Sequence, residues 1–212
     1  MCAIVNQRRN FVNKMSPRNY DMGKRGAAVE RTRRRIVDAT RALHGERGIA
    51  ATSWEDIAAR AGVGVGTVYR HFPSVDELIP ACGRATMEEV ALPDPEAAPA
   101  LFADTAGDEA RLARLAREAF GIYERGAPQL RAARRERDVH PAVRESADAL
   151  EASLAALVAA GLEPLEPTEE DRRVARALLD LGTWEALREQ GLDQQQAVAA
   201  VSGLLVARLG AA

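Results

Sequence analysis

Apolar residues recur three and four positions apart through most of this 212-residue chain, the spacing that places them on one face of an α-helix. Between residues 29 and 47, Ile36, Ala39 and Leu43 form such a stripe, and Gly48 follows where a helix would end. Hydrophobic residues make up 47% of the chain and are mostly Ala, Leu and Val, a composition that favours helices over sheets. The pattern predicts an all-α fold of about nine helices.

Two short helices are predicted after the first one. The stretch "SWEDIAARAG" begins with Ser53 and Asp56 at the spacing of a capping box and ends at Gly62. The next helix places Val68 and Phe72, four residues apart, on its inner face. A short helix, a glycine turn and a second short helix make up a helix-turn-helix.

The run "GVGVGTVYRHF" at residues 62–72 contains three glycines at alternate positions. Free backbone N–H groups at the start of a helix attract anions, so the run suits either a nucleotide cofactor or a nucleic-acid backbone. A dinucleotide site needs G-x-G-x-x-G after a strand, whereas these glycines are spaced G-x-G-x-G after a helical pattern. The spacing therefore excludes the dinucleotide fingerprint and favours nucleic acid.

Beyond Ser74 the pattern predicts further helices with two interruptions. A helix follows Ser74, the Pro- and Ala-rich residues 92–107 are a connection, and "EPLEPT" breaks the chain again. The other predicted helices are, in order, residues 108–126, 128–138, 141–161, 169–191 and 193–210. The last is apolar on two faces, so we expect one face to pack in its own core and the other to meet a partner. These faces are formed by Val198, Val201 and Leu205 and by Ala197, Ala200 and Leu204.

Charge divides the chain into two parts. Residues 1–72 carry 14 basic and 6 acidic side chains, whereas the remainder carries 15 and 25. A basic part joined to an acidic one suits nucleic-acid binding through one end, because phosphates supply most of the sequence-independent affinity; chance is the alternative. All four asparagines lie in the first 21 residues. We therefore expect a disordered or misassigned extension at 1–21, followed by a basic and an acidic module.

The sequence contains little that points to catalysis. Two cysteines and three histidines occur without H-E-x-x-H or C-x-x-C spacing, which predicts no metal site, no cofactor and no enzyme activity. No apolar run approaches 18 residues and no signal-peptide pattern opens the chain, so we expect a cytoplasmic protein with no membrane partner. An all-helical carrier or enzyme with an incidental helix-turn-helix is the alternative.

The run "SWEDIAARAGVGVGTVYRHFPSVDEL", with its surroundings from about residue 30 to 80, resembles the DNA-binding signature of TetR-type transcriptional regulators. The resemblance implies a homodimeric repressor that binds a palindromic double-stranded DNA operator and is released by an unidentified small-molecule effector. It implies a helix-turn-helix DNA-binding domain at 22–80 and a helical effector-binding and dimerisation domain at 81–212. It also implies that the second helix of the helix-turn-helix enters the major groove and that the last two helices of each subunit form the dimer interface. The implied DNA-binding residues are Ser53, Trp54, Val65, Gly66, Thr67, Tyr69, Arg70 and His71.

Side-chain chemistry assigns roles to these residues. Val65 and Thr67 offer methyl groups to thymine, the Thr67 hydroxyl can bond a base or a phosphate, and Gly66 lets the backbone approach closely. The tyrosine, arginine and histidine at 69–71 hold phosphates. The alternatives are that the tyrosine packs on the first helix and that the histidine is a surface residue.

Four positions depart from the usual pattern of the family. Gly64 stands where Ser or Thr commonly caps the reading helix, and Val75 stands where a Lys usually follows the next cap. His44 replaces a phenylalanine, and we interpret it as a partly buried core histidine. Trp54 either donates its indole N–H to a phosphate or covers the seam between the first two helices. The basic residues between 24 and 35 contact the DNA backbone or form a solvated face.

Four aromatic residues lie where the family places its effector pocket: Phe102, Phe120, Tyr123 and Trp184. They either line a small-molecule cavity or pack in the core. His140, at a predicted helix start, is a further pocket candidate or a loop residue.

Overall fold

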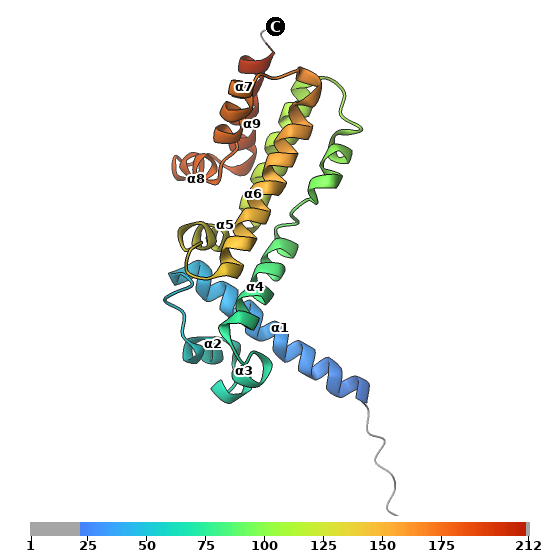
Figure 1. The fold of residues 1–212 in the computed structure, drawn as a ribbon. Helices are drawn as coiled ribbons and strands as arrows, with labels where there is room; N and C mark the ends of the chain where they lie inside the picture. The colour runs from blue at the N-terminus through green and yellow to red at the C-terminus, as the bar shows by residue number, and fades with distance from the viewer. Residues whose placement is uncertain (1–21, 211–212) are drawn as a thin grey trace, which may run out of the picture.

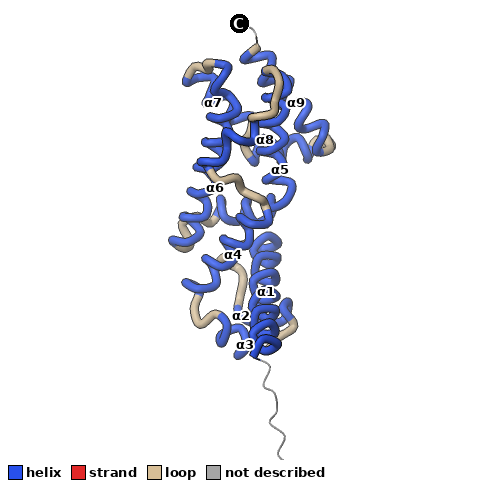
Figure 2. The backbone as a smooth tube through the Cα atoms, turned by 90° about the vertical axis from the view of Figure 1, so that its right-hand side faces the viewer, coloured by secondary structure: helices blue, strands red, loops and turns tan. Residues whose placement is uncertain are grey.

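The computed structural model describes residues 22–210, and all regular structure in that range is helical (Figure 1, Figure 2). Nine α-helices and two short 3-10 helices follow one another there, which confirms the all-α prediction. The molecule is elongated: α1, α2 and α3 lie at one end, α7, α8 and α9 at the other, and α5 and α6 run between them (Figure 1). No helix in the described range is long and apolar enough to cross a membrane. The predicted extension at 1–21 lies outside the described residues.

Helices α1 (Met22–Arg47), α2 (Trp54–Ala61) and α3 (Val65–His71) enclose a small core of their own. Val68 and Phe72 are completely buried in it, as their spacing predicted. The first helix begins before the predicted residue 29, and the other two match the prediction closely.

The ends of α2 follow the local sequence signals. The Ser53 hydroxyl accepts a hydrogen bond from the Asp56 N–H at 3.1 Å, and the Asp56 carboxylate accepts one from the Ser53 N–H at 3.3 Å. At the other end, Gly62 adopts a left-handed conformation with φ 63°, which glycine tolerates without strain. The predicted capping box and helix end are confirmed.

Helix α4 (Val75–Glu89) leads away from the helix-turn-helix, and the segment after it differs from the prediction. The Pro- and Ala-rich stretch predicted as a plain connection contains a 3-10 helix, η1 (Pro95–Phe102). That prediction was wrong because the Asp94 side chain caps the segment, while Ala98 and Phe102 are buried in the main core.

Helices α5 (Asp108–Arg135) and α6 (Pro141–Leu162) form the long central pair, and η2 (Glu163–Leu165) follows α6. The two helices predicted on either side of residue 127 join into α5, which kinks where Gly126 leaves the helical conformation (φ −148°). A Cβ atom on Gly126 would lie 2.4 Å from Cγ1 of Val90. Only a glycine allows α5 to pass the end of α4 at this distance.

Helices α7 (Glu169–Leu178), α8 (Leu181–Glu189) and α9 (Gln194–Leu209) form the far end of the molecule. The sequence pattern predicted α7 and α8 as one long helix, and this was wrong. The Asp180 carboxylate accepts a hydrogen bond from the Gly182 N–H at 2.8 Å and starts a new helix at that point.

The final helix does have an inner and an outer face, but the division differs from the prediction. Ala197, Val201 and Leu205 are buried, and α9 packs along α5. Val198 is only partly buried, and Leu204 is 55% exposed. Ala197 thus joins the core, contrary to its predicted place beside Leu204.

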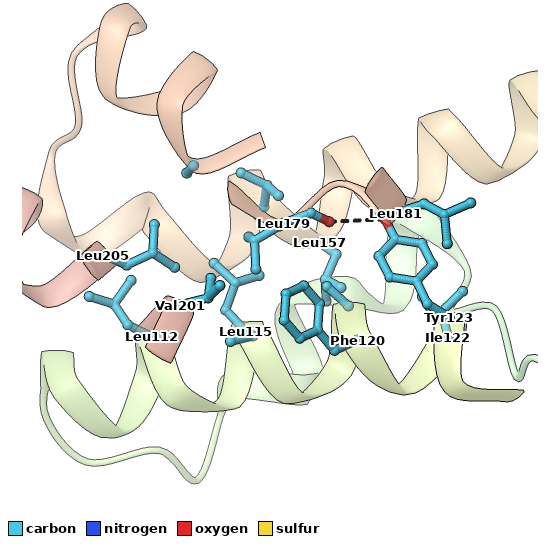
Figure 3. Close-up of a cluster of buried hydrophobic side chains, with 14 of the residues drawn as sticks. Leu112, Leu115, Phe120, Ile122, Tyr123, Leu157, Leu179, Leu181, Val201 and Leu205 are labelled. Carbon is cyan, nitrogen blue, oxygen red and sulfur yellow. Dashed lines mark hydrogen bonds between the residues drawn. The ribbon is translucent and has the colours of Figure 1, made fainter. Parts of the chain in front are cut away.

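The main core lies between α5, α6 and the last helices (Figure 3). Leu112, Leu115 and Phe120 extend from α5 into this core and are fully buried. The Tyr123 hydroxyl, from the same helix, donates a hydrogen bond at 2.9 Å to the Leu179 carbonyl. This bond fixes the α7–α8 break against α5.

Candidate nucleic-acid interface

The turn between α2 and α3 leaves the backbone open on one side. Gly64 begins α3 without a side-chain cap. A Cβ atom placed on Gly64 or Gly66 would meet no other atom within 4 Å, so both glycines face free space. The first N–H groups of α3 are therefore accessible to a flat anionic surface, the kind of surface that a nucleic-acid backbone presents.

The outer face of α3 carries the side chains that the sequence singled out. Tyr69 is 45% exposed and Arg70 is exposed, whereas Val65 and Thr67 are partly buried. The Arg70 guanidinium donates a hydrogen bond to Thr67 Oγ1 at 3.3 Å. These two side chains consequently share one face, with a hydroxyl and a cation side by side.

Trp54 packs against the tyrosine of α3. The ring centroids of Trp54 and Tyr69 lie 4.9 Å apart at an interplanar angle of 31°. Trp54 is partly buried against the small core, so it forms a wall behind the more exposed tyrosine. The Tyr69 ring is thereby held between α2 and solvent.

Ser53 and His71 lie at the edges of this face. The Ser53 hydroxyl donates to the Asp56 carboxylate at 2.6 Å in addition to accepting from its N–H, so its hydrogen bonding is largely used by the cap. His71 is partly buried at the end of α3. Both residues remain within the surface formed by the start of α2 and by α3.

Two of the basic residues in α1 hold the helix-turn-helix together. Arg33 Nη1 donates to the His71 carbonyl at 3.0 Å, and its guanidinium lies 4.1 Å from the centre of the Phe72 ring. Arg35 Nη2 donates to the Gly62 carbonyl at 3.2 Å and to the Ala61 carbonyl. Both arginines satisfy carbonyls at helix ends, a role that sequence reasoning missed. Arg31 and Arg34 are exposed.

Glu136, at the end of α5, holds the loop between α1 and α2. Its carboxylate oxygens accept hydrogen bonds from the Ile49 N–H at 3.1 Å and from the Ala50 N–H at 2.7 Å. This Glu136 contact joins the helix-turn-helix to the central helices across 86 residues of sequence. No local signal in the sequence points to it.

His140 forms a second contact of the same kind. Its Nδ1 accepts a hydrogen bond from the Ala142 N–H at 3.1 Å and caps α6, so the ring proton is on Nε2. Nε2 donates to the Asp76 carboxylate, in the first turn of α4, at 2.8 Å. The histidine is therefore a helix cap tied to α4.

Burial controls the charge of two groups near this junction. Desolvation lowers the pKa of His44 to about 4, although the nearby Glu136 carboxylate partly opposes the shift. Desolvation likewise raises the pKa of the Cys82 thiol to about 12. Both side chains are neutral at physiological pH, and the prediction of a partly buried histidine is confirmed.

Two neighbouring cavities lie along the central helices α5 and α6, and one of them adjoins the helix-turn-helix. The junction cavity, of about 50 Å³, is bounded by α1, α4, α5 and α6 and includes His44 and Ile49 in its wall. The inner cavity, of about 70 Å³, lies between α5, α6 and α8 and includes Tyr123. The two share Met87 and Leu130, among others.

The four aromatic residues expected at an effector pocket have different surroundings. Tyr123 lines the inner cavity. The centroids of the Tyr123 and Trp184 rings lie 6.2 Å apart, and the Trp184 indole N–H donates a hydrogen bond to Gln194 Oε1 at 2.8 Å. Phe102 and Phe120 are fully buried core residues and line neither cavity. Residues 22–210 hold no cluster of His, Cys, Asp and Glu that would bind a metal ion.

Comparison with known proteins places the helix-turn-helix in one family. Residues 36–82 match the family model described as bacterial regulatory proteins, tetR family. The transcriptional repressor KstR of Mycolicibacterium smegmatis is 48% identical over 61 residues, which are 28% of this chain and 30% of that protein. The chain thus spans less than a third of the length of the curated relatives it matches.

Solved structures extend the likeness to most of the chain. A TetR family member from Streptomyces coelicolor is 27% identical with a TM-score of 0.59, covering 82% of this chain and 97% of that one. The TetR-like regulator LfrR of Mycobacterium smegmatis, in complex with proflavine, is also 27% identical with a TM-score of 0.55, covering 83% and 95%. The likeness includes the helices beyond the helix-turn-helix.

Proposed function

We propose that this chain, which belongs to the TetR family of bacterial regulatory proteins, is a homodimeric transcriptional repressor that a small molecule releases from DNA. The observation that carries the proposal is the exposed surface of α3, where bare glycine backbone, a hydroxyl and a guanidinium adjoin an aromatic pair. A single α-helix fits the major groove, so this surface can meet base edges and phosphates at once.

The proposed DNA contacts are of two kinds, contacts that read bases and contacts that bind phosphates. Val65 and Thr67, at the start of α3, offer methyl groups to thymine, and Thr67 shares its hydroxyl with Arg70. Tyr69, Arg70 and His71 contact phosphates. Trp54 keeps the Tyr69 ring in place, since the two rings already lie in contact at a tilt of 31°.

The proposed dimer interface is the outer face of α9 together with α8. Leu204 is a large apolar side chain that is 55% exposed, and the nearby Gly203 and Ala207 are small and exposed. Small residues allow two helices to approach closely, and a two-fold axis would match a palindromic operator.

The proposed effector site is the pair of cavities between α4, α5, α6 and α8. Of the aromatic residues suggested by the sequence, Tyr123 lies in its wall. The solved structure of LfrR is a complex with proflavine, which supports the binding of a small molecule by this chain as well. Because α1 and α4 also line the junction cavity, a bound molecule would act directly on the helix-turn-helix.

Selection of bound fragments from the source genome, followed by mobility-shift titration, tests the proposal. Thr67→Ala should relax preference at one base position by about 1–3 kcal/mol. Arg70→Ala should weaken binding to all sequences and reduce the slope of log affinity against log salt by roughly one. Arg173→Ala, which removes an exposed arginine from α7, is the matched control and should leave binding unchanged. Equal binding by all three variants would mean that α3 is not the reading helix.

A further inference from the structure

We infer that the effector is a small, uncharged, apolar molecule that occupies the junction and inner cavities together. This inference rests on the proposed function and concerns the chemistry of the ligand. The two cavities share Met87, Leu130, Ala133 and Ser146, so one molecule can reach from one into the other when the Met87 side chain moves. Met87 is flexible and lies between them.

The size of the ligand follows from the space available. The cavities have volumes of about 50 and 70 Å³. A protein cavity of roughly 150 Å³ lined by aliphatic and aromatic side chains accepts benzene. Even together the two cavities are smaller than that, so the ligand they suit is about the size of a single six-carbon ring with at most one small substituent, accommodated when Met87 moves.

Two hydroxyl groups of the wall already have partners within the protein. The Tyr123 hydroxyl donates to the Leu179 carbonyl, and the Ser146 hydroxyl donates to the Ala142 carbonyl at 2.9 Å. The neutral His44 ring forms no hydrogen bond with the described residues, so it offers the junction cavity one uncharged N–H donor and one acceptor nitrogen. The wall therefore suits an apolar ligand with at most a small neutral polar group, and it supplies no charge that would compensate a buried anion.

The charged groups at the rim are also paired. Arg134 Nη1 lies 2.9 Å from Asp180 Oδ1, and Arg137 Nη2 lies 2.5 Å from Asp148 Oδ1. His44, in the junction cavity, is neutral because burial lowers its pKa. A charged ligand would have to break one of these pairs or remain without a counter-ion, and both cost binding free energy.

The same cavities explain how such a ligand would act. One side of the junction cavity is lined by Ile49, Ile79 and Val143, which pack together with Ala142 in a small apolar cluster. The N–H of Ile49 is one of the two groups held by Glu136. A guest that displaces this loop strains the Glu136 contact and loosens the helix-turn-helix.

Titration calorimetry with probes of one shape and different charge tests the inference on the full chain. Benzyl alcohol is neutral, benzoate is an anion and benzylammonium is a cation. We expect the neutral probe to bind at least about tenfold more tightly than either ion, because the wall has no partner for a charge. Equal or tighter binding of an ion, or no binding of the neutral probe, would overturn the inference.

A variant locates the site. Ala133→Leu adds side-chain volume between the two cavities and should weaken binding of benzyl alcohol at least about fivefold, since overfilled space excludes a guest. The control, Ala177→Leu, makes the same change at an exposed position of α7. Circular dichroism shows whether each of the two variants is folded. The comparison of the three probes on the unmodified chain tests the inference even if Ala133→Leu does not fold. Binding that Ala133→Leu does not alter, in a folded chain, would place the probe elsewhere.

Mobility-shift titration separates this inference from the proposed function. Operator binding without any binding of the neutral probe would refute the ligand class and leave the DNA-binding proposal intact. Selective binding of the neutral probe by a chain that binds no DNA would support the ligand class and refute the repressor. We expect both activities, with benzyl alcohol lowering operator affinity.

Discussion

Leu204→Glu and Leu205→Glu, two substitutions at neighbouring positions of α9, should separate subunit association from subunit folding. Leu204 is 55% exposed, on the outer face that we propose as the dimer interface, whereas Leu205 is 1% exposed and lies in the core (Figure 3). The first substitution should leave the subunit folded and weaken the dimer. The second should prevent folding, because it places a carboxylate among apolar side chains.

The magnitudes follow from the exposed fractions. Complete burial of a leucine side chain contributes about 1.5–3 kcal/mol, so covering the exposed half of Leu204 contributes roughly 1 kcal/mol in each subunit. Two copies per dimer, and the repulsion of two carboxylates near the two-fold axis, raise the loss to at least about 2 kcal/mol, or about 30-fold in the dimer dissociation constant. Truncating a buried leucine such as Leu205 costs about 2–5 kcal/mol, and a buried charge costs more.

Sedimentation velocity over a range of concentrations measures the dimer dissociation constant, and circular dichroism shows whether each variant is folded. Ala177→Glu, at an exposed position of α7, adds the same charge away from the proposed interface and should remain a dimer. If Leu204→Glu dimerises with an unchanged constant, the outer face of α9 is not the interface. If Leu205→Glu is a well-folded dimer, the described packing of α9 on α5 is incorrect.

Three further predictions concern single contacts. Trp54→Ala should weaken operator binding by about 0.5–1.5 kcal/mol, because it removes the aromatic contact with Tyr69. The loss should be smaller when Tyr69 is also replaced by alanine. Fluorescence anisotropy measures both losses, and fully additive losses would disprove the coupling. Glu136→Gln should lower the free energy of unfolding by about 1–3 kcal/mol, because the Glu136 carboxylate accepts hydrogen bonds from two backbone N–H groups. Urea unfolding measures this free energy, and a decrease of less than about 0.5 kcal/mol would contradict the prediction. Burial lowers the pKa of His44 from 6.5 to about 4 in the folded protein, so on acidification the unfolded chain takes up the proton first. The folded state therefore has its full stability above pH 6.5 and loses stability as the pH drops toward 4. The loss from this one group is about 3 kcal/mol, and His44→Gln should flatten that part of the pH profile of urea unfolding.

The sequence predicted the helix-turn-helix well because its signals are local. The capping box at Ser53, the helix end at Gly62 and the four-residue spacing of Val68 and Phe72 each depend on neighbouring residues only. The exposed face of α3 follows from the same spacing, since residues between the buried positions must face outward. The resemblance to a known family rests on this stretch alone.

The contacts that connect distant parts of the chain could not be predicted in the same way. The helix break at Asp180 depends on the Asp180 cap together with tertiary contacts, among them the Tyr123–Leu179 bond and the ion pair of Asp180 with Arg134. Arg33 resembles its exposed neighbours in α1, yet the fold places its guanidinium 4.1 Å from the centre of the Phe72 ring. Such roles depend on tertiary geometry, which residue spacing does not encode.

The junction between the helix-turn-helix and the central helices includes a few contacts that a ligand could loosen. Its apolar contacts include the small cluster around Ile79 and Val143, and its polar part includes the Glu136 contact and the bond from His140 to Asp76. Hydrogen bonds to a charged group such as the Glu136 carboxylate are worth about 1.5–3 kcal/mol, whereas the exposed Asp76 carboxylate makes the His140 bond weaker. Loss of the Glu136 contact is therefore of the size usually found for coupling between two ligand sites, about 1–3 kcal/mol. In a two-fold dimer the same movement occurs in both subunits, and half-sites spaced about 34–36 Å apart can no longer be occupied together.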